Sequence, residues 1–183
     1  MARSLARAAA TDGLDEDEVR VLTKAFVLAM GPRVEALEDD HHPAYLHPGR
    51  GPLILLQDVG DVDVSVLVAA ALHESQDHHL EVAASEVEEA MGAATLTVVQ
   101  SIPRPGDERL VERLLTLGSG LALAALAERL DHIRHLHLRD DLVGEWAPTY
   151  SEVLAAWLPF AERTHPQLAR RYAHWARTFV KRI

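Results

Sequence analysis

The chain has 183 residues, of which 48% are hydrophobic and 25% are charged, and this length suits one domain with a sizeable core. Its net charge of −10 argues against a nucleic-acid partner, because binding a phosphate backbone requires a basic face. No run of about 18 apolar residues is present, which excludes a transmembrane helix. There is no cysteine, which excludes disulfides, thiolate zinc sites and cysteine nucleophiles.

The first residues contain arginines and alanines but lack the leucine-rich core of a secretory signal. We therefore expect a cytoplasmic protein. Residues 1–14 are predicted to form a flexible tail, and residues 15–183 a single domain.

Four helices are predicted in the first half of the domain. The first spans 15–30, with acidic residues in its opening turn, and ends at Gly31 and Pro32. A short helix follows at 52–58, and the next, at 62–76, is apolar nearly all round and is therefore expected to be buried. Ser85 and Glu88 form a capping-box pattern that starts the fourth helix, which ends at Gly92.

The second half is predicted to be helical as well. The β-branched residues of 94–102 favour a strand, but no partner strand is visible, so a helix is expected there. A long helical region follows over 107–138, with a break at 118–120. The last helices span 149–162 and 166–181, and their aromatic residues are assigned to the core, with a homodimer contact as the alternative. The predicted fold class is all-α, a helical bundle.

Metal-competent side chains gather at the end of the buried helix predicted over 62–76. His73 and Asp77 are four residues apart, and so are Glu74 and His78. In a continuous helix each pair would share one face.

Two further segments carry the same residue types. Glu128 and His132 are again four residues apart in a predicted helix. A polar loop adds three histidines: His41, His42 and His47. Imidazole and carboxylate groups that converge from separate segments are what a mononuclear site for a divalent metal requires.

Each cluster alone has a simpler interpretation. His41 and His42 would more often be solvated loop residues, and the histidines of 77–79 could complement the dipole at a helix C-terminus. The segment does not contain the HExxH pattern of zinc proteases either, because Asp77 stands where the second histidine would be. Only the combination of the three clusters favours a metal site.

Four stretches in order resemble one known family. They read "PAYLHP", "VAAALHESQDHH", "SEVEEAMGAATLTVVQSI" and "LAERLDHIRHL". This order is similar to that of the HD-domain phosphohydrolases, closest to the RelA/SpoT-type hydrolase domain and its small single-domain relatives. The resemblance covers about residues 22–165 and implies an HD-type helical bundle.

The resemblance assigns roles to ten residues. Asp77 and His78 stand where the family has the Glu-Asp pair that orients or activates the attacking water. The positions of the metal ligands are taken by His47, His73, Glu74 and Glu128. Contacts to the substrate are expected from Arg129, Arg134, His132 and Arg33.

The chain departs from the family pattern at informative positions. Ala125 replaces a lysine, and the loop "EALEDDHH" is acidic where the family is basic. Glu74 and Glu128 replace aspartates, while Asp77 replaces a glutamate, so all three positions remain carboxylates. Each exchange changes the reach of the side chain by about one C–C bond, roughly 1.5 Å. We hypothesise that the site is re-centred, in which case Glu74→Gln should abolish metal binding.

The resemblance implies a phosphohydrolase that depends on a divalent metal, with Mn²⁺ as the expected ion. The expected substrate is a small nucleotide phosphate or pyrophosphate, with a (p)ppGpp-like alarmone as the leading candidate. The alternative is a degenerate HD domain that binds a ligand or partner without catalysis, which the lost lysine and the altered Glu-Asp pair favour. Another metal-dependent hydrolase, such as a protease, ranks last.

Overall fold

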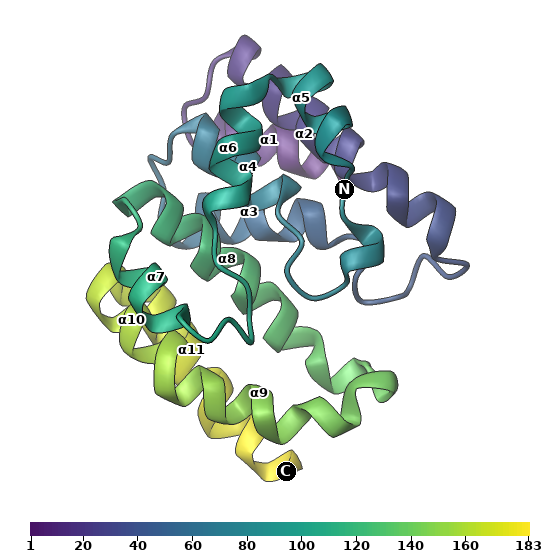
Figure 1. Cartoon of the computed structure of the whole chain (residues 1–183). Coiled ribbons are helices and arrows are strands. Elements are labelled where there is room, and N and C mark those ends of the chain that lie inside the picture. The colour runs from purple at the N-terminus through teal and green to yellow at the C-terminus, as the bar shows by residue number, and fades with distance from the viewer.

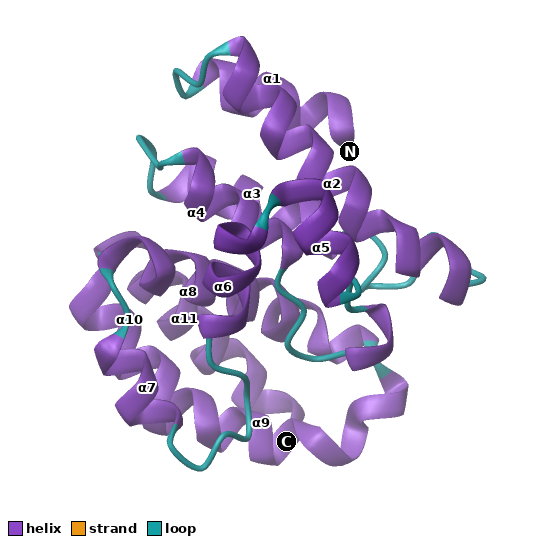
Figure 2. Ribbon diagram, turned by 45° about the horizontal axis from the view of Figure 1, so that its top comes forward, coloured by secondary structure: helices purple, strands orange, loops and turns teal.

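The computed structural model describes residues 1–183 and contains helices and loops but no strand (Figure 2), which confirms the all-α prediction. The α-helices are α1 (Ala2–Thr11), α2 (Glu16–Ala36), α3 (His47–Asp58), α4 (Val64–Leu72), α5 (Ala84–Met91), α6 (Ala93–Ser101), α7 (Leu110–Thr116), α8 (Ser119–His135), α9 (Trp146–Glu152), α10 (Leu158–Thr164) and α11 (Pro166–Phe179). Short 3₁₀ segments are η1 (His78–Leu80), η2 (Leu136–Leu138), η3 (Asp140–Glu145) and η5 (Val180–Arg182), and a π-helical turn, η4, spans Val153–Trp157.

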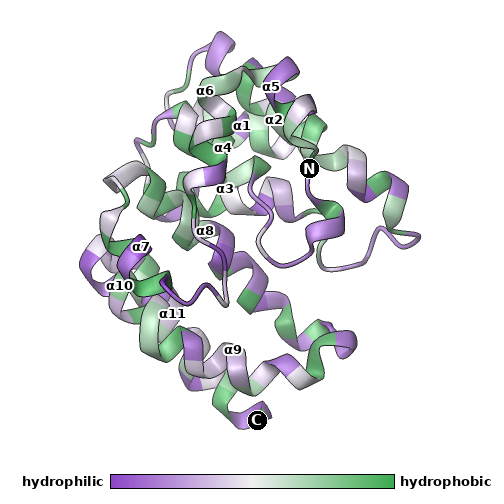
Figure 3. Ribbon diagram, in the orientation of Figure 1, coloured by the Kyte–Doolittle hydropathy of each residue, from purple (hydrophilic) through white to green (hydrophobic).

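Helix α8 crosses the middle of the molecule, with α1–α6 on one side and α7 and α9–α11 on the other (Figure 1). It packs against α3, α4, α10 and α11. Its first half is alanine- and leucine-rich and lies in the core, whereas its second half carries the hydrophilic residues (Figure 3). The main hydrophobic cluster extends from Leu5 in α1 to Phe179 in α11, so both groups of helices share one core.

Residues 2–11 form helix α1, so the predicted flexible tail at 1–14 is wrong. Leu5 and Ala9, four residues apart, are both fully buried where α1 packs against α2 and α3. The segment offers a single leucine among alanines and arginines, and this apolar stripe is too short to recognise in the sequence.

Helix α2 begins as predicted, with Asp15 and Glu18 forming a capping box, but it continues past Gly31 to Ala36. Pro32 lies inside the helix, where it removes one backbone hydrogen bond. The additional turn carries Arg33 into the interior, where it is 2% exposed. Contacts made by Arg33 offset the local cost of the proline.

Helices α3 and α4 both differ from their predicted bounds. Helix α3 begins at His47 rather than at 52, with Pro48 in its first turn and Pro52 inside it. Helix α4 ends at Leu72, four residues earlier than predicted, because His73 has an extended backbone with φ −73° and ψ 128°. The pairs His73–Asp77 and Glu74–His78 therefore do not share a helix face.

The other boundaries agree better with the sequence. Residues 93–101 form helix α6, the helix expected over 94–102, and Gly92, with φ +91°, separates it from α5. The predicted capping box at Ser85 is wrong, since Ala83 is the N-cap of α5 and no side chain caps it. The break in 107–138 falls at Leu117 and Gly118, between α7 and α8.

The C-terminal helices complete the core. The helix predicted over 149–162 begins earlier, at Trp146, and passes through the π-helical turn into α10. Pro166 opens α11 as predicted. Trp157, Phe160 and Trp175 are buried within the chain, in agreement with their assignment to the core. No helix combines the length and the apolar character needed to cross a membrane.

Candidate metal centre

Two segments meet the second half of α8 to form one buried group. Helix α3 begins with His47, the turn after α4 carries His73 and Glu74, and α8 contributes Glu128 and His132. All five side chains are buried, with His132 the most exposed at 6%. The structure thus brings together the four predicted metal ligands. His132, predicted to contact the substrate, lies among them instead.

Glu128 occupies the middle of this group. Its Oε1 lies 3.0 Å from Nε2 of His132, 3.6 Å from Nδ1 of His73 and 3.7 Å from Nε2 of His47. The same oxygen accepts hydrogen bonds from the backbone N–H of Ser75, at 3.0 Å, and from its hydroxyl, at 2.7 Å. Ser75 therefore holds the carboxylate in place against three imidazole rings.

Four buried histidine nitrogens of this group lack hydrogen-bond partners. They are Nε2 of His47, both nitrogens of His73 and Nε2 of His132. Nε2 of His132 lies 3.0 and 3.1 Å from carboxylate oxygens of Glu128 and Glu74, yet the directions do not satisfy hydrogen-bond geometry. Buried polar atoms without partners are rare in folded proteins and destabilising.

A cation bound at this centre would satisfy Nε2 of His47 and Nε2 of His132. Nitrogen lone pairs and carboxylate oxygens that point to a common centre match the ligand preferences of divalent transition metals. His47, Glu74 and His132 each offer a ligand atom, and these atoms lie within 4.8 Å of one another. The buried group could therefore hold a metal ion.

The turn after α4 is organised by Glu74. Its Oε1 accepts hydrogen bonds from the backbone N–H groups of Gln76, at 2.9 Å, and Asp77, at 3.0 Å. Its Oε2 pairs with the guanidinium of Arg33. Burial alone would raise the pKa of Glu74, but the charges of His132, His47 and Arg33 hold this pKa well below its usual range.

Asp131, which the sequence reasoning missed, orients His47. Its Oδ2 lies 2.8 Å from Nδ1 of His47, and Nε of Arg50 donates to both carboxylate oxygens, at 2.9 and 3.0 Å. A carboxylate that accepts the Nδ1 proton leaves the Nε2 lone pair of His47 free to face the centre, as in carboxylate–histidine–metal arrangements. The signal was present in the sequence, because Asp131 is three residues after Glu128 on one helix.

His132 sits between two carboxylates and is stacked on His47, with ring centroids 3.9 Å apart. Burial alone would lower the pKa of His132, but the carboxylates of Glu74 and Glu128 outweigh it and raise this pKa to about 10. The pKa of Glu128 is in turn held well below its usual range, against burial, by His132 and His73. A metal ligand must be unprotonated, so metal binding at His132 releases a proton.

Arg33, expected to contact the substrate, is buried, and each of its three guanidinium nitrogens already donates within the protein. Nε donates to the carbonyl of Ala44 at 3.0 Å, and Nη1 donates to the carbonyls of Ala29 at 2.7 Å and Leu80 at 3.0 Å. Nη2 pairs with Glu74. Arg33 is thus a buried structural cation that holds Glu74 and three loop or helix carbonyls together.

The two predicted catalytic residues differ in position. Asp77 is buried and makes a bidentate ion pair with Arg139, at 2.8 and 3.0 Å. Arg139 also donates to Asp141, and the hydrogen bonds that it donates to Asp141 and Asp77 raise its pKa against the effect of burial. His78 is exposed at 69% of its side chain and faces Arg104. The structure therefore does not bring His78 into the buried group.

The two arginines predicted to bind the substrate phosphate do not face the cluster. Arg129 is buried and donates to Oε1 of Gln76 at 3.0 Å and to Oε1 of Glu152 at 3.1 Å. Arg134 is exposed and lies in a groove between the end of α8 and α11. Only two arginines, Arg50 and Arg139, line the cavity beside the cluster, and neither was predicted.

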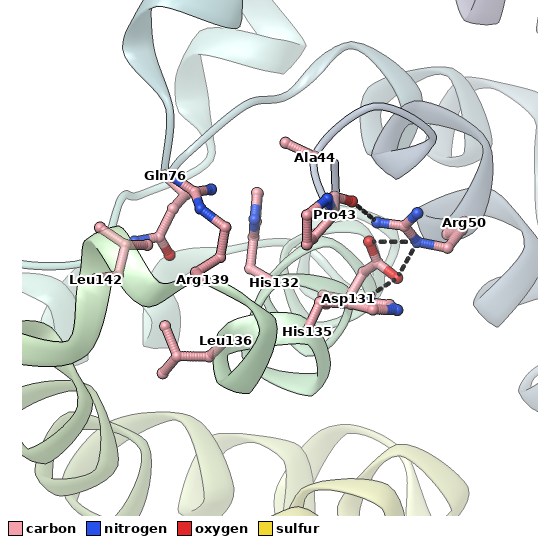
Figure 4. A pocket seen from close by; sticks show the side chains of 10 residues that line it. All are labelled: Pro43, Ala44, Arg50, Gln76, Asp131, His132, His135, Leu136, Arg139 and Leu142. Carbon is pink, nitrogen blue, oxygen red and sulfur yellow. Dashed lines mark hydrogen bonds and ion pairs between the residues drawn. The ribbon is translucent and has the colours of Figure 1, made fainter. Parts of the chain in front are cut away.

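The cavity beside the cluster is small and polar (Figure 4). His132 projects into it between Arg139 on one side and Asp131 with Arg50 on the other. Its volume of about 10 Å³ is enough for roughly one water molecule. Leu136, Arg139 and Leu142, from the segment that follows α8, cover it.

No protein-family model matches the chain, and no curated protein matches its sequence significantly.

Proposed function

We propose that the protein is a metal-dependent phosphohydrolase of the HD type that acts on a small nucleotide phosphate or pyrophosphate in the cytoplasm. The observation that carries this proposal is the convergence of unpartnered nitrogens of His47, His73 and His132 on the carboxylates of Glu74 and Glu128. Mixed imidazole and carboxylate ligands suit Mn²⁺. A bound divalent ion lowers the pKa of water and offsets negative charge on a phosphoryl group.

The charges around the centre support an anionic substrate. Four buried carboxylates face three arginines, which leaves one net negative charge: Glu74, Glu128, Asp131 and Asp77 with Arg33, Arg50 and Arg139. A divalent ion bound to neutral histidines changes this sum to one net positive charge. Local positive charge in a water-excluded site attracts a phosphate group and stabilises the transition state.

Arg139 and Asp77 would exchange partners when the substrate binds. Both guanidinium Nη atoms of Arg139 now contact Asp77, and Arg139 lines the cavity. A substrate phosphate would compete for this guanidinium, since arginine binds phosphate in the same bidentate way as carboxylate. Asp77, released from Arg139, would then accept a proton from the attacking water. The segment that covers the cavity must move aside at this step.

A second candidate function is a ligand-binding module without catalysis. It is favoured by the protonation of His132, whose pKa of about 10 lets its imidazolium ion supply the missing positive charge between Glu74 and Glu128. The centre is then neutral without a metal. The cavity volume of about 10 Å³ also leaves no room for a nucleotide in this conformation.

Elemental analysis after incubation with Mn²⁺ and dialysis tests the metal centre. We expect about one metal ion per chain in the wild type and none in Glu74→Gln, because the substitution removes a charged ligand. His79→Gln is the matched control, since His79 is an exposed histidine five residues after Glu74, in the 3₁₀ segment η1. A wild type that retains no metal, or a Glu74→Gln variant that retains all of it, contradicts the proposed centre.

Turnover distinguishes the two candidate functions. Phosphate or pyrophosphate release from guanosine and adenosine polyphosphates, (p)ppGpp included, is measured with Mn²⁺ and with a chelator. The phosphohydrolase requires release that depends on the metal and is lost in Asp77→Asn. Metal binding without release from any of these nucleotides favours the binding module.

A further inference from the structure

The charge of the chain is distributed very unevenly. Residues 163–183 contain six Lys or Arg residues and no Asp or Glu, so the other 162 residues carry a net charge of −16. Most of this basic segment is helix α11, whose apolar face is buried through Leu168, Tyr172, Trp175 and Phe179. Only the basic face of α11 is left at the surface. Such a charge asymmetry indicates an anionic partner for the basic part.

The basic side chains of α11 gather with those of α8 around one hollow. A groove of about 370 Å³ runs between the end of α8 with η2 and the helix α11 with η5. Five of its eight lining residues are basic and none is acidic: Arg134, His137, Arg171, His174 and Arg182. The remaining lining residues are Trp175, Thr178 and Phe179. The groove is thus cationic, and it is also lined by the aromatic rings of Trp175 and Phe179 and by the hydroxyl of Thr178.

The arginines of the groove have N–H groups that donate to no other group of the protein. Nη2 of Arg171 donates to Oδ1 of Asp58 at 2.6 Å, and Asp58 is a buried carboxylate at the end of α3. This ion pair fixes the Arg171 guanidinium and leaves its other N–H groups without a protein partner. Neither Arg134 nor Arg182 lies within 4.0 Å of any carboxylate. The metal-centre arginines, in contrast, are all paired.

From this geometry we infer that the groove between α8 and α11 binds a small phosphate-bearing anion such as a pyrophosphate group. Several guanidinium groups around one recess match the charge and the many acceptor oxygens of phosphate better than those of a single carboxylate. The volume is that of a small-molecule site. An extended polyanion such as RNA would meet the acidic surface of the remaining chain, so the groove selects a compact ligand.

This site is separate from the metal centre. Arg134 follows His132 by two residues, which turns its side chain by about 200° around α8. The groove and the cavity beside the metal centre have no lining residue in common. The inference therefore does not depend on the proposed catalytic activity.

Isothermal titration calorimetry with inorganic pyrophosphate tests the inference, in a buffer of low ionic strength that contains a chelator. We expect one site per chain. The double variant Arg134→Gln/Arg182→Gln should weaken the affinity about a hundredfold, since each charged hydrogen-bond donor is worth about tenfold. The matched control is Arg163→Gln/Arg177→Gln, which removes the same charge from exposed residues outside the groove and should weaken binding less than threefold.

Three results would overturn the inference. The first is absence of pyrophosphate binding to the wild type. The second is equal weakening in both double variants, which would show attraction by overall charge alone. The third is unchanged binding in the groove variant, which would place the anion elsewhere. A urea-unfolding midpoint equal to that of the wild type shows that the fold of the groove variant is intact. A single-stranded RNA oligonucleotide that binds more tightly than pyrophosphate would contradict selection for a compact ligand.

Discussion

The two faces of α8 differ in the burial and pairing of their charged side chains. On the face toward α3 and α4, Glu128 and Asp131 are buried, and every charge near them has a partner of opposite sign. On the face toward α11, Arg134 is exposed and unpaired. Burying an ion without a partner costs several kcal/mol, whereas an exposed ion remains hydrated. The buried face can therefore fix a geometry, and the exposed face is free to attract a ligand.

The metal centre and the groove also differ in how strongly they depend on contacts with distant parts of the chain. The partners of Asp131, His47 and Arg50, come from more than 80 residues away in the sequence. The groove is built from two helices near the C-terminal end, and its charges repel one another more than they attract. The metal centre should therefore respond to substitution through stability, and the groove through binding.

The largest effect is expected for Glu128→Ala. The substitution leaves protonated His132 with one carboxylate in place of two and removes the acceptor for both donors of Ser75. Breaking a buried ion pair by removing one partner typically costs about 3–5 kcal/mol. Urea unfolding of the chelator-treated protein should show a loss of this size, and metal binding should be abolished.

Glu128→Gln is the control for Glu128→Ala. It keeps an oxygen that can accept from Ser75 while removing the charge, so it should lose metal but less stability than the alanine variant. An unfolding free energy of Glu128→Ala within about 0.5 kcal/mol of the wild type would show that the buried contacts of Glu128 contribute little to stability. The buried and exposed faces of α8 would then not differ in their effect on stability.

Asp131→Asn should have the next largest effect, on metal affinity. An amide can donate to Nδ1 of His47 and so favour the tautomer whose Nε2 carries the proton, which blocks the metal ligand. Loss of such an outer carboxylate typically weakens metal binding 10–100-fold. Competition with a chromogenic chelator measures this loss. Asp141→Asn, which removes an exposed carboxylate near the same cavity, should leave the affinity unchanged.

Much of the fold could be predicted from local sequence. The break near Gly118 and the start of α11 at Pro166 depend on glycine and proline, which are local features. The helix over 94–102 was expected against its local propensity, because no partner strand was visible in the sequence. The residues that follow the early end of α4 contact distant parts of the chain instead. Beyond the helix end, Glu74 pairs with Arg33 and His73 lies 3.6 Å from Glu128, and these contacts span more than 40 residues.

The candidate site was predicted by residue type but not by geometry. The four expected ligands, His47, His73, Glu74 and Glu128, do come together. The arginines were misplaced because a basic residue in a sequence does not reveal which carboxylate it faces. Arg33 was expected to contact the substrate and is buried instead, since Pro32 does not end α2. Arg139 was missed because it follows α8 in an irregular segment with no periodic pattern.

The stability of the protein should depend on pH through His132, on the buried face of α8. The folded pKa of His132, about 10, lies above its ordinary value of 6.5. Its ionic contacts therefore stabilise the chelator-treated protein fully below pH 6.5, and this stabilisation is lost between pH 6.5 and 10, by up to about 1.4 kcal/mol per pH unit. Urea unfolding at a series of pH values measures the slope.

His132→Gln is the control for this slope, because it removes the titrating group and should flatten the curve over pH 6.5–10. Saturation with metal should flatten it as well, since a coordinated imidazole carries no exchangeable proton at the metal-binding nitrogen. Equal slopes in the wild type and His132→Gln would mean that His132 is not an imidazolium ion, which would remove the main support for the binding module without catalysis.

The smallest effect on stability is expected in the groove. Arg134→Gln removes an exposed charge that has no carboxylate partner, so the unfolding free energy should stay within about 0.5 kcal/mol of the wild type. Relief of repulsion from Arg171 and Arg182 should make any change favourable, and added salt should diminish it. Urea unfolding at low and high ionic strength measures both. A loss of more than 1 kcal/mol would mean that Arg134 supports the fold. A small increase in the unfolding free energy of Arg134→Gln that disappears in high salt would mean that the arginines of the groove repel one another in the wild type. Such repulsion without an anion present is what an anion-binding site is expected to show.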